Sequence, residues 1–279
     1  MHLVSLKNPR VKQVVRLRDR RGRDREERMI IEGYRCLRRA LANHVPIDEL
    51  YVCEELFQGE NEQALISALA EQGATVFTTT EPVFRKMAYR DRPEGLLGLA
   101  PQLRRSLADL PDSAPPPLYL VAEAIEKPGN LGTMLRTCDA TGVTGLILCD
   151  PCTDLFNPNV VRASTGSVFS VPVAEATADE AFAWLANGGV RVLAATPHAD
   201  RLYTEVDLSG PLAIAVGAEQ YGLSQEWLDR ADLQVRIPML GQADSLNVAT
   251  ATALLLYEAV RQRMEAGVVA RPREAPNAH

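Results

Sequence analysis

Three stretches of this chain carry polar side chains among residues that are otherwise small or apolar. Ser245 and Asn247 open a segment with the composition of a buried helix, Asn130 and Arg136 share a second stretch, and Glu219 lies between two glycines in a third. A helix N-terminus has unpaired backbone N–H groups and a positive dipole end, which suit a polar ligand or a developing negative charge. The three stretches together predict a site for binding or catalysis.

Each stretch also has a structural interpretation. Asn130 follows a Pro-Gly turn and could serve as a helix N-cap, with Arg136 on the solvated face of that helix. Glu219 precedes a predicted helix at Ser224 and would favour its dipole. Taken one stretch at a time, these structural roles stay open.

The cysteines point away from metal and redox chemistry. Cys149 and Cys152 have the CxxC spacing, but there is no second such pair and the four histidines are dispersed. We therefore expect Cys149 in the core, reduced thiols throughout and no metal site. Motifs typical of serine hydrolases, P-loop NTPases and dinucleotide-binding folds are missing.

The strands and helices predicted around the polar stretches indicate an α/β domain with a parallel sheet. Near-continuous apolar strands separated by helical patterns predict a parallel sheet covered on both faces. Ligands collect at the carboxyl ends of such strands, where all three polar stretches lie. The predicted strands are 118–122, 145–149, 168–173, 190–195, 212–216 and 233–238.

A smaller α/β domain is predicted before this sheet. Strands and helices alternate over residues 29–100, and the proline-containing stretch 106–117 reads as a linker with a boundary near Ala114. We expect a basic N-terminal arm over residues 1–28, a small domain over 29–113 and a larger domain over 114–279. Strands are predicted at 29–31, 50–53, 75–77 and 95–100, and helices at 33–43 and 62–72.

Charge is distributed unevenly along the chain. The 279 residues have a net charge of −6, but residues 1–39 hold thirteen Lys or Arg and five Asp or Glu, a balance of +8. Such a stretch is typical of a basic arm that contacts phosphates. The acids mixed into it equally fit a solvated helix face with internal ion pairs. No apolar run is long enough to span a bilayer and the amino terminus lacks a signal-peptide core, so we expect a cytoplasmic protein.

Three motifs of the chain resemble those of the SpoU (TrmH-like) branch of the SPOUT RNA methyltransferases. They are Asn130-x-Gly-x-x-x-Arg136, Gly217-x-Glu-x-x-Gly-Leu223 and Ser245-Leu-Asn-Val. Residues 157–167 resemble the segment between the first two motifs, and Glu32-Gly33 is similar to a substrate-binding domain that often precedes them. The resemblance extends in order over residues 118–263.

The resemblance implies a parallel-sheet domain with a deep trefoil knot that binds S-adenosylmethionine, and a homodimer. It also implies a small α/β substrate-binding domain before the knotted domain. The catalytic residues that it implies are Asn130, Arg136, Glu219, Ser245 and Asn247. The cofactor-binding residues are Thr196, Pro197, Gly217, Glu219, Ile237, Met239, Leu246 and Asn247, and contacts to RNA are expected from Arg21, Arg23, Arg136 and Arg162.

The implied activity is S-adenosylmethionine-dependent methylation of a ribose 2′-hydroxyl in RNA, with 23S ribosomal RNA as the expected substrate. A tRNA 2′-O-methyltransferase and a non-catalytic RNA-binding protein or chaperone are the alternatives. Arg136 would act either as the base that removes the hydroxyl proton or as a clamp on the neighbouring phosphate. We favour the clamp, because deprotonating a free arginine near neutral pH costs about 7 to 9 kcal/mol.

Overall fold

The structure is a computed structural model that describes residues 1–111 and 116–270. The chain divides into two compact units, and the first comprises residues 1–104, 127–136 and 152–171. The second comprises the rest of the described chain. Two segments expected in the domain 114–279 therefore group with the amino-terminal part of the chain. The boundary expected near Ala114 lies outside the described residues.

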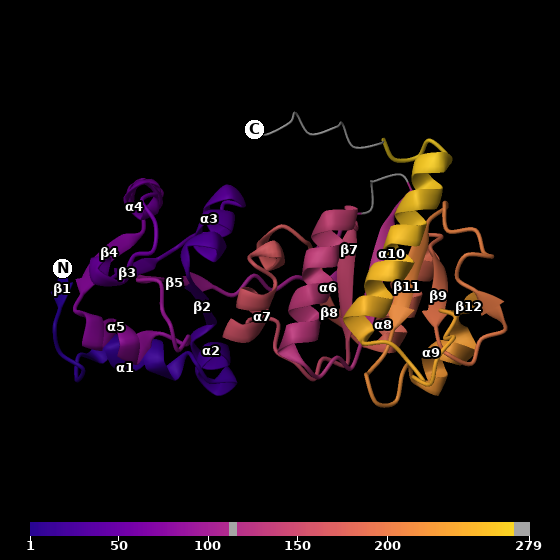
Figure 1. Ribbon diagram of the computed structural model, residues 1–279, viewed down its shortest axis with the longest axis horizontal. Helices are drawn as coiled ribbons and strands as arrows, with labels where there is room; N and C mark the ends of the chain where they lie inside the picture. Colours follow the sequence, from indigo (N-terminus) through magenta and orange to yellow (C-terminus); the bar gives the residue numbers. More distant parts are fainter. Residues whose placement is uncertain (112–115, 271–279) are drawn as a thin grey trace. The chain divides into compact units, whose positions relative to one another are not determined.

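The first unit is built on a five-stranded mixed sheet in the order β1-β4-β3-β5-β2 (Figure 1). Neighbours among β1, β4 and β3 are parallel, whereas β5 is antiparallel to both β3 and β2. The elements predicted for residues 29–100 all form. The strands are β1 (His2–Leu3), β2 (Arg28–Glu32), β3 (Glu49–Val52), β4 (Thr75–Thr79) and β5 (Leu96–Pro101). The helices are α1 (Pro9–Arg16), α2 (Arg20–Glu26), α3 (Tyr34–Ala42), η1 (Glu54–Leu56), α4 (Glu62–Glu71), α5 (Glu81–Met87), α7 (Pro158–Ala163) and η3 (Ser167–Phe169).

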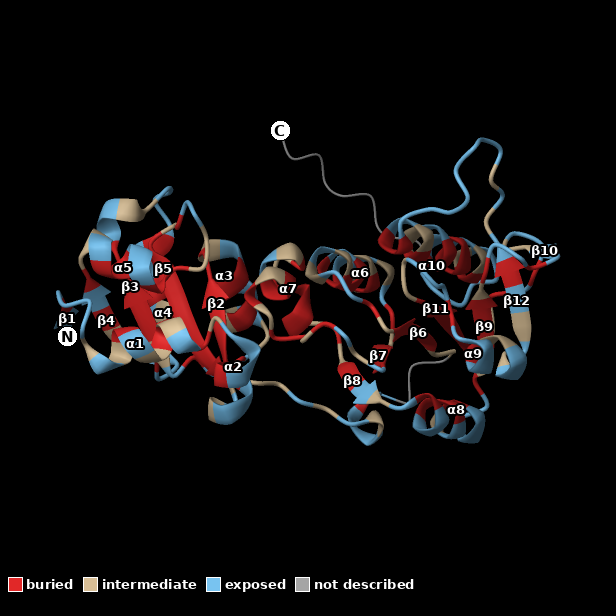
Figure 2. Ribbon diagram, turned by 90° about the horizontal axis from the view of Figure 1, so that it is seen from below, coloured by how far each residue is buried: buried red, intermediate tan, exposed pale blue. Residues whose placement is uncertain are grey.

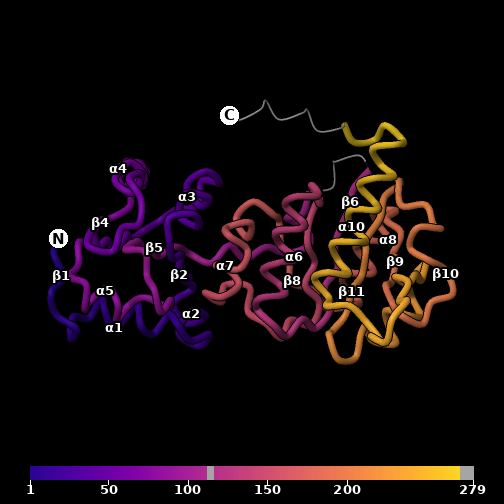
Figure 3. The backbone as a smooth tube through the Cα atoms, in the orientation of Figure 1, coloured from indigo at the N-terminus to yellow at the C-terminus, as the bar shows by residue number. Residues whose placement is uncertain are grey.

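Residues 1–28 are part of this unit, so the prediction of a separate basic arm is wrong. Figure 3 follows the chain from β1 through α1 and α2, and β1 pairs in parallel with β4. Val11, Val14 and Leu17 are buried in the same apolar cluster as the first sheet. Helix α1 begins where Asn8 accepts a hydrogen bond from the Arg10 backbone N–H at 2.9 Å and Pro9 takes the first helical position. That Asn-Pro pair was the sequence signal for a folded segment.

The second unit is built on a seven-stranded sheet in the order β10-β12-β9-β11-β6-β7-β8, in which every neighbouring pair is parallel. This confirms the predicted parallel sheet. The strands are β6 (Leu118–Glu123), β7 (Gly145–Cys149), β8 (Val173–Ala176), β9 (Arg191–Ala195), β10 (Arg201–Leu202), β11 (Leu212–Val216) and β12 (Leu233–Arg236). The helices are η2 (Leu107–Asp109), α8 (Ala178–Asn187), α9 (Gln225–Arg230) and α10 (Val248–Glu265). Helix α6 (Pro128–Thr141) is divided, with residues 128–136 in the first unit and residues 137–141 in the second.

Both faces of this sheet are covered. Every residue of β6, β7 and β11 is buried, as the red strands in Figure 2 show. Helices α8 and α9 pack on one face, where the rings of Phe182 and Trp227 lie 4.2 Å apart between centroids. Helix α10 lies on the other face beside β11. No helix in the described part of the chain is long and apolar enough to cross a membrane.

One predicted strand of the large sheet is wrong. The strand predicted over residues 168–173 does not form, because Val168 and Phe169 lie in the 3-10 helix η3 (Ser167–Phe169) and the strand β8 begins only at Val173. Gly166 has a positive φ of 90° that turns the chain into η3, and Pro172 has no N–H for a sheet ladder. Apolar residues therefore form the core here without an extended backbone. The trefoil knot stays a prediction.

Candidate active site

A cavity of about 360 Å³ lies at the carboxyl ends of three neighbouring strands, β9, β11 and β12. The residues that follow each strand and the turn before α10 form its walls. This is the edge of a parallel sheet at which ligands bind. The lining residues are Ala195, Thr196, Pro197, His198, Val216, Gly217, Ala218, Glu219, Gln220, Tyr221, Gly222, Leu223, Leu228, Val235, Ile237, Met239, Asp244, Ser245, Leu246, Val248 and Ala251.

Most of this lining is apolar, with polar groups at a few points. The carboxylates of Glu219 and Asp244 are the acidic groups of the wall, and Ser245 and Thr196 add hydroxyls. Pockets of this size with an apolar wall and a few polar groups suit a small molecule that has a flat apolar body and a charged end. The acidic groups would favour a ligand with positive charge.

The loop after β11 is held in a tight turn, for which glycine is needed at both ends. A Cβ on Gly217 would lie 2.1 Å from the backbone C and O of Gly222, so no larger residue fits there. Gly222 has a positive φ of 70°, and its N–H donates to the Ala218 carbonyl at 2.8 Å. The turn places Glu219 on the cavity wall.

The far end of this loop is fixed by a buried carboxylate. Glu123, the last residue of β6, is 6% exposed and accepts a hydrogen bond from the Ser224 backbone N–H at 2.7 Å. Ser224 is the N-cap of α9 and its own side chain makes no capping bond. Glu123 therefore fixes the start of α9 from the end of β6. Glu123 lies outside the three sequence motifs, although an acid at the end of an otherwise apolar strand is a signal that the sequence offers.

Ser245 and Asn247 have different roles at the start of α10. Asn247 is the N-cap of the helix, and its Oδ1 accepts hydrogen bonds from the backbone N–H groups of Ala249 and Thr250 at 3.0 and 3.4 Å. Ser245 and Leu246 line the cavity, whereas Asn247 is not among the lining residues. The predicted helix start is confirmed. Of the two polar residues there, Ser245 lies at the cavity and Asn247 caps the helix.

The cavity brings together most of the residues predicted to bind a cofactor. Thr196 and Pro197 come from the end of β9, Ile237 and Met239 from the segment after β12, and Leu246 from the turn before α10. Gly217 and Glu219 join them from the loop after β11. His198, Asp244 and the 78% exposed Tyr221 also line the cavity and were not predicted. Each of these three residues lies within two positions of a predicted cofactor-binding residue, and this proximity is the sequence signal that could have identified it.

Asn130 and Arg136 lie on α6, in the segment that groups with the first unit. Arg136 is exposed and Asn130 is half-buried. A Cβ on Gly132 would lie 2.4 Å from the Ala163 Cβ, so the first turns of α6 pack closely against the end of α7. Only glycine fits at this position.

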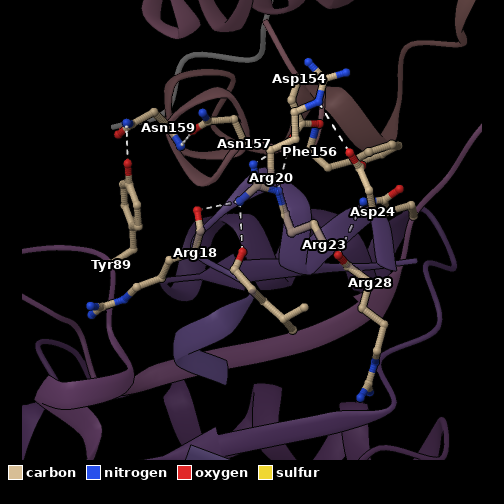
Figure 4. A network of polar contacts seen from close by, with 12 residues as sticks. Arg18, Arg20, Arg23, Asp24, Arg28, Tyr89, Asp154, Phe156, Asn157 and Asn159 are labelled. Carbon is tan, nitrogen blue, oxygen red and sulfur yellow. Dashed lines mark hydrogen bonds and ion pairs between the residues drawn. The ribbon is translucent and has the colours of Figure 1, made fainter. Parts of the chain in front are cut away.

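The expected contact between Arg23 and RNA is corrected by the structure. The Arg23 side chain is 1% exposed, and its Nε donates to Asp154 Oδ2 at 2.9 Å (Figure 4). Its Nη1 also donates to the backbone carbonyls of Leu17 and Arg18. A guanidinium buried in these contacts cannot reach a phosphate. Arg21 and Arg162 are exposed, so they remain available for RNA.

Cys149 is buried in the core of the second unit, as expected, and burial raises the pKa of its thiol to about 12. A thiol with so high a pKa is a poor nucleophile and metal ligand at neutral pH. Cys152 is exposed. In residues 1–111 and 116–270, no group of three or more His, Cys, Asp or Glu side chains could hold a metal ion.

Comparison with known families identifies this arrangement. The SpoU rRNA Methylase family matches residues 117–257, and the MRM3-like substrate binding domain matches residues 8–98. The chain belongs to the SpoU rRNA methylase family. The substrate-binding match includes most of residues 1–28, in agreement with the folded amino terminus.

Relatives of known sequence and structure agree with this membership. The chain is 30% identical to the 23S rRNA (guanosine(2553)-2′-O)-methyltransferase RlmP of Bacillus subtilis, over 91% of this chain and 96% of RlmP. It is 39% identical to the tRNA (guanosine(18)-2′-O)-methyltransferase of Thermus thermophilus, over 62% of this chain and 89% of that enzyme. The crystal structure of the AdoMet-bound rRNA methyltransferase from Sinorhizobium meliloti has a TM-score of 0.85 and 33% identity, over 94% of this chain and 97% of that one.

These findings confirm the predicted family and activity class. The chain is an RNA 2′-O-ribose methyltransferase of the SpoU family, and S-adenosylmethionine is its methyl donor. Its architecture, an amino-terminal substrate-binding domain with a parallel-sheet methyltransferase domain, is also as predicted.

Proposed function

We propose that the protein methylates a ribose 2′-hydroxyl of 23S ribosomal RNA, with S-adenosylmethionine bound in the cavity at the ends of β9, β11 and β12. The cavity carries the proposal, because eight residues expected from the family motifs line it. RlmP, a relative that matches 91% of the chain and so includes the substrate-binding domain, is named for 23S rRNA. The tRNA-methylating relative matches only 62% of the chain. An rRNA substrate is therefore favoured over tRNA.

The cavity fits the chemistry of the methyl donor. S-adenosylmethionine has a flat adenosine, a sulfonium cation and an amino-acid end, and it supplies an electrophilic methyl group. Ile237, Met239 and Leu246 offer apolar contact for the adenosine. The carboxylates of Glu219 and Asp244 offer negative charge to the sulfonium and the ammonium group.

The residues of this chain would then position the RNA. Arg136 would clamp the phosphate next to the target nucleotide and orient its 2′-hydroxyl, because a bidentate guanidinium can do both without losing a proton. Asn130 and Ser245 would fix Arg136 and the ribose by hydrogen bonds. Asn247 would act through the start of α10, which it caps, and so set the position of Ser245. The 2′-hydroxyl explains a preference for RNA over DNA.

We also propose that the enzyme is a cytoplasmic homodimer. Leu254 and Tyr257 are 38% and 53% exposed on α10, and Leu240 is 98% exposed in the segment before it. Large apolar side chains exposed around one helix are typical of an interface. Analytical ultracentrifugation of the wild-type chain should give a dimer, and replacement of Leu254 and Tyr257 by Glu should give a monomer. A monomeric wild type at micromolar concentration would contradict the proposal.

The test of the function is mapping of 2′-O-methylation in ribosomal and transfer RNA from cells with and without the protein. One 23S rRNA nucleotide should lose its methyl group in the deletion strain. Loss confined to tRNA would favour the tRNA alternative. A non-catalytic RNA-binding protein or chaperone would leave every methylation unchanged, and calorimetry with S-adenosylmethionine would then show no binding.

A further inference from the structure

Tyr221 is an exposed aromatic side chain at the mouth of the cavity. Of the exposed large apolar side chains in the described part of the chain, two line this cavity, Tyr221 at 78% exposed and Leu246 at 37%. Leu246 already offers apolar contact for the adenosine, whereas Tyr221 has no role in the proposed activity so far. Tyrosine is enriched at binding interfaces, because its ring covers a large area and its hydroxyl stays hydrated.

Within the described residues, no ring contact or hydrogen bond holds the Tyr221 side chain. Aromatic rings in the core of the same unit do pack against each other, as those of Phe182 and Trp227 do at 4.2 Å between centroids. The ring of Tyr221 is instead open to solvent beside a binding cavity. It is therefore available to a ligand.

The loop that carries Tyr221 has a fixed backbone on both sides of this residue. Ala218 and Gly222 form an isolated antiparallel bridge, in which the Gly222 N–H donates to the Ala218 carbonyl at 2.8 Å. Leu223 is 6% exposed, and the Ser224 N–H beyond it is held by a buried carboxylate of β6. The ring is thus presented on a preorganised turn, so little backbone freedom is lost when a ligand binds to it.

The reaction brings a nucleotide to this wall of the cavity. Methyl transfer needs the 2′-oxygen within about 3 to 3.5 Å of the methyl carbon. The base is bonded to C1′, the neighbour of C2′, so the base of the target nucleotide must lie beside the cavity when its 2′-hydroxyl is inside. Glu219 and Asp244 on the wall disfavour a phosphate there, because like charges repel. The flat, uncharged face of a base is the part of the RNA that suits this position.

We propose that Tyr221 stacks on the base of the target nucleotide and so positions its ribose for methyl transfer. The inference rests on the proposed binding of S-adenosylmethionine in this cavity. Proteins hold unstacked bases of RNA on aromatic side chains, and such a contact accepts every base because each has a π face. Tyr221 would therefore contribute affinity and position, and the identity of the base would be read by other groups.

The test compares Tyr221→Ala and Tyr221→Leu, which remove the ring, with Tyr221→Phe and Tyr221→Trp, which keep one. Leu retains an apolar side chain without a π face. We expect kcat/KM for unmodified, in vitro transcribed 23S rRNA to fall about 5- to 140-fold in the Ala and Leu variants, the range for one lost base–aromatic stack. The Phe and Trp variants should stay within about three-fold of wild type. Each fold-change should be the same over a series of KCl concentrations, because a stack releases no counterions.

Two further measurements separate other roles of the ring. Calorimetry should give a dissociation constant for S-adenosylmethionine within about three-fold of wild type in all four variants, and ultracentrifugation should give the wild-type assembly. The proposal would be overturned by a Leu variant as active as the Phe variant, by an unchanged Ala variant, or by an equal loss of S-adenosylmethionine affinity. A wild type that does not bind S-adenosylmethionine would count against the proposed function. A wild type that methylates only another RNA would count against the proposed substrate, and the variants would then be compared on that RNA.

Discussion

Arg136 is the residue on which the chemistry of the proposed reaction depends. It is exposed on α6, and as a cation it can hold a phosphate and orient a hydroxyl at the same time. As a base it would have to lose a proton at a cost of about 7 to 9 kcal/mol near neutral pH. As a clamp, Arg136 would lower the barrier to methyl transfer by positioning the 2′-hydroxyl and by stabilising developing negative charge, and it would keep its proton.

Replacing Arg136 by Ala should lower kcat by about 10²- to 10³-fold, the usual cost of losing one preorganised charge-stabilising donor. The dissociation constant of S-adenosylmethionine should change by less than about three-fold, because no cavity-lining residue is altered. Single-turnover methylation of 23S rRNA and calorimetry measure the two quantities. Arg85→Ala, which removes an exposed arginine of α5, is the control and should behave as wild type. An active Arg136→Ala enzyme would refute the assignment.

At the scale of elements, the cavity depends on where strands and loops end. The loop from Gly217 to Leu223 closes tightly because Gly217 has no Cβ to clash with the Gly222 backbone and Gly222 has a positive φ, and Glu123 of β6 holds its far end through Ser224. The neighbouring strand thus sets the position of a loop that carries Glu219. Hydrogen bonds to a charged, buried acceptor contribute about 1.5 to 3 kcal/mol.

Glu123→Ala should therefore raise the dissociation constant of S-adenosylmethionine about ten-fold, with kcat at saturating S-adenosylmethionine within about three-fold of wild type. Asp232→Ala is the matched control. Asp232 accepts a hydrogen bond from the Val192 backbone N–H, also at 2.7 Å, at the opposite end of the sheet. This control should lower the melting temperature without weakening S-adenosylmethionine binding. Equal weakening in both variants would show that Glu123 acts only on stability.

The carboxyl-terminal helix α10 is tied to the sheet by one buried cation. Arg263 is 3% exposed and donates to the backbone carbonyls of Pro116, Pro117, Leu208 and Gly210. Burial lowers the pKa of its guanidinium to about 10, so it stays charged at neutral pH. These carbonyls precede β6 and β11, so a single side chain fixes the helix to the starts of two central strands.

Arg263→Ala should lower the free energy of unfolding by about 3 to 5 kcal/mol, because several buried carbonyls lose a charged donor. The neighbouring Arg261→Ala is the control. Arg261 is half-exposed and pairs with Glu265, which is exposed, and with Glu258, which is 9% exposed, on the same helix. Because the Arg261 guanidinium is in contact with solvent, we expect these pairs to contribute about 1 kcal/mol or less. Urea denaturation measures both changes. Similar losses in the two variants would contradict the anchoring role.

At the scale of the whole molecule, the compact units do not follow the order of the chain. Residues 152–171 lie within the family match for the methyltransferase domain, yet they group with residues 1–104. The buried Arg23–Asp154 pair and the hydrogen bond from Asn159 to the Tyr89 hydroxyl hold this segment in the first unit (Figure 4). Deletion of residues 1–28 would therefore remove core residues as well as charge.

Breaking the Arg23–Asp154 pair should destabilise the protein by about 3 to 5 kcal/mol in either single variant, Arg23→Ala or Asp154→Ala, because a buried charge is left without its partner. The double variant Arg23→Met with Asp154→Leu should recover much of this loss. Arg20→Ala, on the same helix but in an exposed pair, should cost about 1 kcal/mol or less. Urea denaturation measures the free energy of unfolding of each variant. Single variants as stable as Arg20→Ala would contradict the structural role of the Arg23–Asp154 pair.

The amino-acid sequence alone was sufficient for the sheet, the family and most of the cavity. Strands β6, β7, β9, β11 and β12 are short apolar runs whose pattern is local, and the motif residues follow those strands directly. Side chains at the carboxyl ends of neighbouring parallel strands must come close together. Position along the chain therefore determines which residues can line the cavity.

Tertiary structure was needed wherever a residue's role depends on a partner that is distant in the sequence. The local sequence predicts that Arg23 belongs to a solvated basic arm, whereas in the fold Asp154, 131 residues away, lies beside it in the core. The role of Glu123 as a loop anchor likewise depends on Ser224, which is 101 residues away in the sequence. Burial and pairing are set by such long-range contacts, which local pattern and composition do not encode.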